Sequence, residues 1–278
     1  MLIGYNINSN NTLEDILKND ANYFQIFTSD PTKFIYNNNF SLSKETKKYI
    51  KENNIGIVIH GSFCINLARS ENDKIALNSI YLLKNDLKIC NNIGALGVVI
   101  HMGKDTEKLG ETKSIENYIN NLNKILRETK DGIIILETGA NCGSEVGSKL
   151  NILGMIREKC ICKDRVKFCI DTCHIYSSGY DIADEDFVDI LEEYIEKTLG
   201  WNNVILAHIN DSKDLLNSKK DRHADITDGD ISKRNLQSFM KFVNNFAKRN
   251  IPMILETPSE NVSYDDQINL IEFFMNKF

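Results

Sequence analysis

The fold class that this sequence predicts is α/β, a single (β/α)8 barrel of the TIM type. Three observations support it: a length of 278 residues, eight short apolar runs, and amphipathic segments between the runs. Barrels of this kind typically have about 250 residues. We therefore expect residues 1–278 to form one domain. A doubly wound open sheet is the alternative, but eight regular alternations favour closure.

The eight apolar runs have the character of parallel strands. They are rich in β-branched residues and nearly continuous in their apolar character, as strands covered on both faces by other elements must be. No Gly/Ser-rich linker separates them. In order they are LIGYNI (2–7), YFQIFT (23–28), IGIVIH (55–60), LGVVIH (96–101), GIIILET (132–138), VKFCID (166–171), NVILAHI (203–209) and IPMILET (251–257).

Amphipathic segments between these runs predict helices. Their ranges are 12–20, 41–54, 71–94, 114–132, 184–200, 232–250 and 263–278. Segment 114–132 carries a helical stripe of apolar residues at Ile115, Ile119, Leu122 and Leu126. We expect an N-cap at Ser41 or Ser43 and a C-cap at Gly94.

Composition limits the compartment and the partners. The formal net charge of −6 does not indicate a nucleic-acid binder, so any affinity for phosphate needs a basic stripe or bound cations. The N-terminus lacks the features of a signal peptide, and no apolar run approaches about 20 residues, so we expect no membrane span. Seven cysteines, several inside apolar runs, indicate reduced thiols in an intracellular, reducing compartment, with cytoplasm, nucleus and virion left open.

Residues suited to metal binding follow the predicted strands. In a (β/α)8 barrel the active site lies at the carboxyl ends of the strands. One histidine in such a place is usually structural, but all five histidines of the chain at one predicted mouth are hard to assign to chance. The candidate ligands are His60, His101, Glu137, Asp171, His174, His208, Asp221, His223 and Glu256.

Nine nitrogen and oxygen ligands exceed the needs of one metal ion. With one carboxylate bridging, they could hold three ions, and imidazole together with carboxylate favours zinc or manganese over magnesium or calcium. Three divalent ions against four carboxylates would leave about +2 at the site. An acidic protein could thus present a positive mouth to a phosphate, and multi-metal sites recur in phosphoryl displacement.

Five motifs resemble those of endonuclease IV, the trinuclear-zinc family of apurinic/apyrimidinic (AP) endonucleases. The resemblance extends from about the second predicted strand to the C-terminus, with the motifs in order. The third and fourth motifs are highly specific, whereas LET alone is weak. They are HGSFCINLA (60–68), LETGANCGSEVG (136–147), CIDTCHIYSSGYD (169–181), HINDSKDLLNSKKDRH (208–223) and LETP (255–258).

The resemblance implies a ligand set for each of three zinc ions, with manganese as an alternative at one position. The first set is His60, His101 and Glu137. Glu137 would bridge to a second ion, completed by Asp171, His208 and Glu256. The third set is His174, Asp221 and His223. Every position carries the expected residue type.

The resemblance also implies an activity. The family hydrolyses the DNA backbone 5′ to an abasic site, leaving a 3′-hydroxyl and a 5′-deoxyribose phosphate, and similar enzymes clear blocked 3′ ends. Glu137, Asp171 and Glu256 are then the expected catalytic residues. The expected partner is double-stranded DNA with abasic sites, and a monomer is the expected state.

DNA contacts must come from the loops that follow the strands. The family kinks DNA and flips the abasic nucleotide out of the helix. Phe63 stands where members usually carry tyrosine, and Lys33, Arg69, Lys104 and Arg222 are candidates for phosphate contacts. Each cation could equally be a solvated surface charge.

Two segments depart from the family pattern. Residues 224–230, ADITDGD, lack the usual second histidine and Gly-x-Gly, and residues 27–34, FTSDPTKF, lack an expected arginine. Both departures leave the nine candidate ligands intact. They leave DNA contacts and damage preference open.

Three other functions compete with this interpretation. A single-metal sugar isomerase or epimerase would need only Glu137, Asp171, His208 and Glu256, and would leave the other candidate ligands without a purpose. A UV-damage endonuclease would have similar metals and a different lesion. A non-catalytic DNA-binding barrel would not need an intact ligand set.

Two cysteines flank the ligand Asp171. Cys169 shares strand parity with it, so we expect Cys169 to point into the barrel as a small apolar filler one layer below the metals. Cys173 lies close to the site, but no ligand set needs it.

Overall fold

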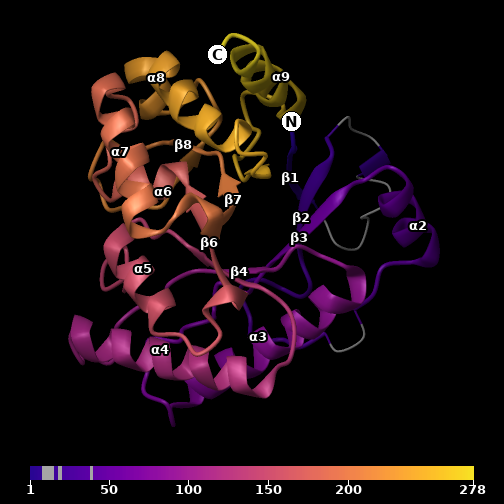
Figure 1. The fold of residues 1–278 in the computed structure, drawn as a ribbon, viewed down its shortest axis with the longest axis vertical. Helices are drawn as coiled ribbons and strands as arrows, with labels where there is room; N and C mark the ends of the chain where they lie inside the picture. Colours follow the sequence, from indigo (N-terminus) through magenta and orange to yellow (C-terminus); the bar gives the residue numbers. More distant parts are fainter. Residues whose placement is uncertain (8–15, 18–20, 38–39) are drawn as a thin grey trace.

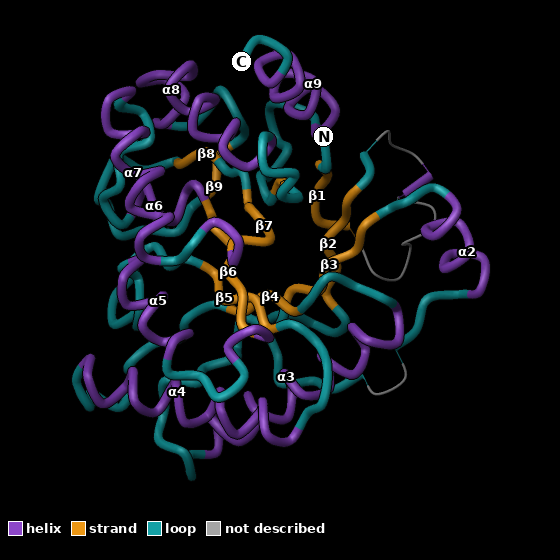
Figure 2. Tube along the Cα trace, in the orientation of Figure 1, coloured by secondary structure: helices purple, strands orange, loops and turns teal. Residues whose placement is uncertain are grey.

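The computed structural model describes residues 1–7, 16–17, 21–37 and 40–278. In these residues eight parallel strands close into a barrel in the order β1-β10-β7-β6-β5-β4-β3-β2, which confirms the predicted fold and excludes the open sheet. Figure 2 shows the strands lining the centre of the molecule. They are β1 (Ile3–Ile7), β2 (Tyr23–Phe27), β3 (Gly56–His60), β4 (Val98–Ile100), β5 (Ile134–Glu137), β6 (Val166–Asp171), β7 (Val204–His208) and β10 (Met253–Leu255).

Helices surround this ring of strands (Figure 1). Six of the seven predicted helices are present, and the one expected at 12–20 lies mostly outside the described residues. None of the described helices is both long and apolar enough to cross a membrane. They are α2 (Lys44–Glu52), α3 (Lys74–Ile93), α4 (Glu111–Glu128), α5 (Leu150–Glu158), α6 (Thr172–Ser177), α7 (Glu185–Thr198), α8 (Asp230–Ala247) and α9 (Tyr264–Met275), with 3-10 turns at Lys163–Arg165 and Trp201–Asn203.

Local signals in the sequence set the ends of several helices. The Ser43 side chain accepts a hydrogen bond from the Thr46 backbone N–H at 3.0 Å, so Ser43 rather than Ser41 is the N-cap of α2. Gly94 ends α3 with φ at 72°, a left-handed conformation that glycine adopts without strain. The four apolar residues of the stripe predicted in 114–132 are all buried on α4.

One apolar layer of the barrel interior takes a side chain from each of seven strands. Cys169 is one of them, fully buried, which confirms its predicted direction. Tyr23 is the largest, and a Cβ on Gly56 would lie only 1.9 Å from the Tyr23 ring, so a glycine makes room for it. The seven are Tyr23, Val58, Val99, Ile135, Cys169, Leu206 and Ile254.

Candidate metal centre

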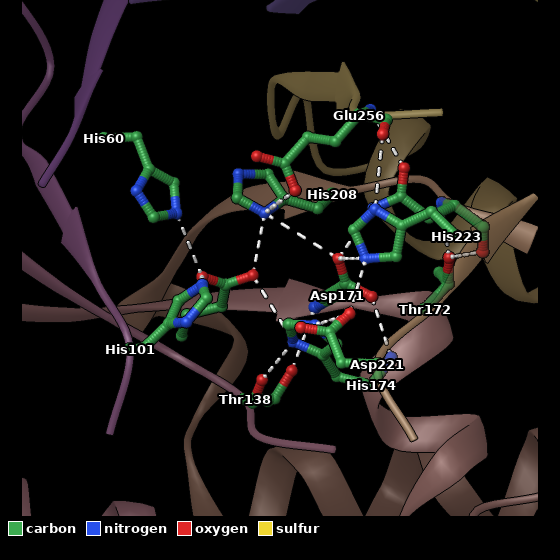
Figure 3. Close-up of polar contacts among 12 residues, drawn as sticks. His60, His101, Thr138, Asp171, Thr172, His174, His208, Asp221, His223 and Glu256 are labelled. Carbon is green, nitrogen blue, oxygen red and sulfur yellow. Dashed lines mark hydrogen bonds and ion pairs between the residues drawn. The ribbon is translucent and has the colours of Figure 1, made fainter. Parts of the chain in front are cut away.

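Six of the nine predicted ligands lie in one layer at the mouth of the barrel. Side chains alternate along a strand, so the position two residues after an inward-facing residue faces inward again. Two residues beyond Val58, Val99, Ile135, Cys169, Leu206 and Ile254 lie His60, His101, Glu137, Asp171, His208 and Glu256. Figure 3 shows the imidazoles of this layer gathered around its carboxylates.

The other three ligands come from segments that follow strands β6 and β7. His174 lies in α6, and the Asp171 side chain caps this helix by accepting the His174 backbone N–H at 2.8 Å. Asp221 and His223 end a loop closed by a two-stranded ribbon, β8 (Asp211–Ser212) and β9 (His223–Ala224), in which Ser212 pairs with His223. A short helix and a short ribbon thus bring the last ligands over the barrel.

The first two predicted ligand groups share Glu137. Its Oε2 lies 3.4 Å from His60 Nε2 and 3.1 Å from His101 Nε2, and its Oε1 lies 2.9 Å from His208 Nδ1. His208 Nδ1 also faces Glu256 Oε2 at 3.1 Å. Each group has its ligand atoms within 4.8 Å of one another, in the combinations that the resemblance implied.

The third group meets around Asp221. Its Oδ1 lies 3.0 Å from His174 Nε2 and 3.1 Å from His223 Nε2. Asp171 also lies within 4.8 Å of these two histidines, and so joins the second group to the third. Cys173 is within the same distance of Asp221 and His223, closer to a ligand position than the sequence suggested. Burial raises the pKa of the Cys173 thiol to about 12.

Hydrogen bonds fix the tautomers of four imidazoles. In each, one ring nitrogen meets a carbonyl oxygen, which only accepts, so that nitrogen must carry hydrogen. In a neutral ring the other nitrogen, which faces the carboxylates, then carries a lone pair. The pairs are His60 Nδ1 with Gly61 O (2.7 Å), His174 Nδ1 with Thr138 O (2.7 Å), His208 Nε2 with Gln25 Oε1 (2.9 Å) and His223 Nδ1 with Glu256 O (3.3 Å).

Lone pairs aimed at carboxylates need a proton or a cation between them. His174 Nε2 and His223 Nε2 are buried and make no hydrogen bond, although each lies near Asp221. Burial lowers the pKa of His223, but the charge of Asp171 and the Asp221 carboxylate outweigh it and raise that pKa to about 9. The field that would hold protons here would equally hold divalent cations, so the residues fit a multi-metal site.

The five residues predicted to contact DNA differ in their exposure and in their partners. Phe63 is 52% exposed at the mouth, and its ring lies 5.4 Å from the His60 ring and 5.5 Å from the His101 ring. Lys104 is exposed and has no acidic partner within the described parts of the chain.

The other three predicted cations already have partners. Arg69 is 16% exposed and bonds Asp73, the N-cap of α3, at 2.6 Å. Arg222 Nε donates to Asp214 at 2.6 Å, and Lys33 pairs with Asp30 at the same distance. The structure therefore brings Phe63 to the metal centre and ties these three cations to carboxylates.

A pocket of about 350 Å³ opens beside the ligands. Besides aromatic side chains and several ligands, its lining includes Asn6 and Thr257, whose side-chain oxygens are buried without a hydrogen-bond partner. Sequence reasoning did not single out these two residues. Their positions offered a signal, because Asn6 is near the carboxyl end of β1 and Thr257 directly follows Glu256.

The comparisons with known proteins agree on one family. A family model described as a xylose isomerase-like TIM barrel matches residues 13–274. A putative endonuclease 4 of Acanthamoeba polyphaga mimivirus is 37% identical over 270 residues, covering 91% of this chain and 85% of that protein. A probable endonuclease 4 of Mycoplasma genitalium is 34% identical over 255 residues, covering 90% of this chain and 85% of that protein.

The fold agrees with a solved structure as well. Endonuclease IV from Thermus thermophilus superposes with a TM-score of 0.81 at 21% identity, covering 100% of both chains. The relatives extend over most of this chain, and the nine ligand residues lie within the span of the family model. The chain is a nuclease of the hydrolase class and belongs to the endonuclease 4 family of xylose isomerase-like TIM barrels.

Proposed function

We propose that this protein is a zinc-dependent AP endonuclease of base excision repair. It acts as a monomer on double-stranded DNA and hydrolyses the backbone 5′ to an abasic site, leaving a 3′-hydroxyl and a 5′-deoxyribose phosphate. It also clears blocked 3′ ends. The chain holds three zinc ions, with manganese as an alternative at one position.

The observation that carries this proposal is the shared use of buried carboxylates. Glu137 is 1% exposed and faces the first two ligand groups with different oxygens, and Asp171 lies within reach of the second and third. A single-metal isomerase needs only the second group. The buried, lone-pair-bearing nitrogens of His174 and His223 would then have no purpose.

Metal ions held by these ligand groups would supply water that ionises near neutral pH and a counter-charge for the phosphoryl group. Glu137 and Asp171 hold adjacent ligand groups at a fixed separation. Glu256 lines the pocket and is 17% exposed, so its carboxylate also orients the attacking water. Phe63 fills the gap left by the flipped nucleotide.

The exposed cations around the mouth of the barrel contact the DNA phosphates. Lys104 is free to contact DNA directly. Lys33 and Arg222 must exchange their carboxylate partners for phosphates, which costs little at exposed positions. Arg69 contributes least, because it is largely buried against the cap of α3.

The test uses a 5′-labelled duplex with one tetrahydrofuran abasic analogue and protein of measured metal content. We expect about three zinc ions per chain and a single incision 5′ to the analogue, giving a 3′-hydroxyl that a polymerase extends. Complete removal of metal with a strong chelator abolishes incision. An uncut strand under every metal condition would refute the proposal.

The same assay separates the competing functions. One divalent ion per chain would favour the isomerase. Zinc-loaded protein that binds the duplex without cutting it would favour a DNA-binding barrel, and incision only beside UV photoproducts would favour a UV-damage endonuclease.

A pair of aspartate variants on either side of β9 tests the third ligand group. Asp221→Asn should lose most incision activity. Asp228→Asn should stay close to the parent, because the Asp228 carboxylate pairs with Lys233 and Asn261 and contacts no candidate ligand. Equal activity in the two variants would remove the third group from the proposal.

A further inference from the structure

We propose that Gln25, on β2, is a positioning residue that sets the tautomer of His208 and the orientation of Glu256. The inference rests on the proposed metal-dependent function and extends it to a residue that is not itself a ligand. Neither motif nor charge drew attention to Gln25 in the sequence, because it lies inside the apolar run YFQIFT.

Gln25 occupies the ligand layer on a strand that supplies no predicted ligand. It lies two residues beyond Tyr23, the interior side chain of β2, as the six strand-borne ligands lie two residues beyond theirs. The side chain is fully buried. An uncharged but polar group in this layer must find hydrogen-bond partners there, or its burial is costly.

Both ends of the Gln25 amide contact predicted ligands of the second group. Its Oε1 accepts the His208 Nε2–H at 2.9 Å, and its Nε2 donates to Glu256 Oε1 at 2.6 Å. Turning the amide over would set its carbonyl against a carboxylate, so the contact with Glu256 fixes its orientation. That orientation in turn requires hydrogen on His208 Nε2.

These two contacts select which atoms remain for a metal. With hydrogen on Nε2, the neutral His208 ring directs its Nδ1 lone pair toward Glu137 Oε1 and Glu256 Oε2. Glu256 Oε1 is engaged by Gln25, which leaves Oε2 as the free ligand oxygen. Partners that orient a ligand in this way typically change metal affinity by about 10- to 100-fold.

Only an amide of this length supplies both functions at once. An ionised carboxylate accepts but cannot donate, so it would hold His208 and repel Glu256, whereas a thioether would hold neither strongly. Gln25→Glu and Gln25→Met therefore separate the two contacts, since both substitutions keep nearly the same length of side chain.

The matched control is Gln267, a second fully buried glutamine. Its amide accepts the Ile226 N–H at 2.9 Å and donates to Val262 O at 2.8 Å, so it joins backbone groups and touches no predicted ligand. Gln267→Met has the same chemical change as Gln25→Met and should not alter zinc retention.

The experiment measures zinc retained after dialysis against graded chelator concentrations, with circular dichroism to verify folding. We expect Gln25→Met to release one of three zinc ions at about 10- to 100-fold lower chelator concentration, with the other two held as in the parent. Gln25→Glu keeps the contact with His208 but repels Glu256, so we expect it to weaken retention of the same ion less than Gln25→Met does and to lower kcat.

The outcomes distinguish this inference from the proposed function. A folded Gln25→Met protein that holds all three ions like the parent would overturn the inference alone. If Gln25→Met does not fold, a Gln25→Glu protein with the parental kcat would overturn the inference instead. A parent that binds no zinc would overturn the proposed function and the inference with it.

Discussion

Two buried carboxylates of the candidate metal centre, Glu137 and Glu256, have lowered pKa values. Glu137 is almost completely buried, which by itself would raise its pKa, but His101 and His208 outweigh burial and hold that pKa well below its usual range. The pKa of Glu256 is likewise lowered, because His208 outweighs both burial and the charge of Glu137. Both groups are therefore ionised at neutral pH, which is the state that metal binding requires.

Glu256→Gln is the most informative single substitution at the site. It removes the negative charge beside His208. It also replaces one of the two Glu256 oxygens, of which Oε1 accepts from Gln25 and Oε2 faces His208. We expect incision of an abasic-site duplex to fall by about 100-fold or more, while the protein still folds. Single-turnover kinetics and circular dichroism measure the two effects.

Glu260→Gln provides the control for this substitution. Glu260 is nearby in sequence but 68% exposed, and it makes only a long contact to Lys213 at 4.0 Å. Its substitution should leave the rate unchanged. Near-normal cleavage by Glu256→Gln would remove Glu256 from the catalytic set.

The elements around the site are held by buried carboxylates at loop ends. Asp225 accepts backbone N–H groups of Ser259, Asn261 and Val262, so it joins the segment 224–230 to the loop after β10. Asp211 accepts the Ile231 N–H at 3.0 Å at the start of α8, and a Cβ on Gly229 would lie 2.3 Å from its carboxylate. The segment that departs from the family pattern is thus a well-bonded loop.

A buried carboxyl also joins α3 to the end of β2. Asp86 is 3% exposed, and it accepts the Thr28 hydroxyl at 2.6 Å. Burial raises the pKa of Asp86 to about 7, although the bond from Thr28 opposes this. The folded state then holds this proton more tightly than the unfolded state, so the stabilisation is complete below about pH 4 and is lost as pH rises through about 7.

Asp86→Asn should remove this pH-dependent loss. The amide can still accept the Thr28 hydroxyl but cannot ionise. We expect the free energy of unfolding of the variant, relative to the parent, to rise by a few kcal/mol, on the order of 1.4 per unit of pKa shift, between pH 5 and pH 8. Urea unfolding at both pH values measures it, and a difference that does not change with pH would contradict the account.

For the whole molecule, the nine candidate ligands bring four carboxylates together at the mouth of the barrel. Without cations, Glu137, Asp171, Asp221 and Glu256 rely on protons held by histidines. Burial lowers the pKa values of His174, His208 and His223, but the negative charge around them outweighs burial and raises these values. Cations that bind only the folded state stabilise it, by about 2.7 kcal/mol per site at a hundredfold excess over Kd.

Metal removal should therefore lower the melting temperature as well as the activity. At pH 8 we expect the Tm of chelator-stripped protein to fall by at least about 5 °C, and zinc to restore it. Magnesium should fail to do so, because imidazole ligands favour zinc. Differential scanning calorimetry measures the shift, and an unchanged Tm would contradict a structural contribution from the metals.

Much of this protein follows from local patterns along the chain. The apolar runs and amphipathic segments predicted the closed barrel, because strands buried on both faces and helices buried on one face space their apolar residues differently along the sequence. The candidate ligands were found by the same reasoning, since each strand-borne ligand is the last or next-to-last residue of its run. Cys169 was placed in the interior by strand parity alone.

The tertiary structure decided what depends on contacts between distant segments. It selected the partners of Arg69 and Arg222, which the sequence could assign only as surface cations. It also revealed Gln25, whose amide meets His208 and Glu256 from 183 and 231 residues away. The sequence by itself determined which residue types stand at the strand ends, because that is a local pattern, and its motifs implied how they group. Only the closed barrel decided which side chains share a carboxylate oxygen or a hydrogen bond, because those are distances between strands.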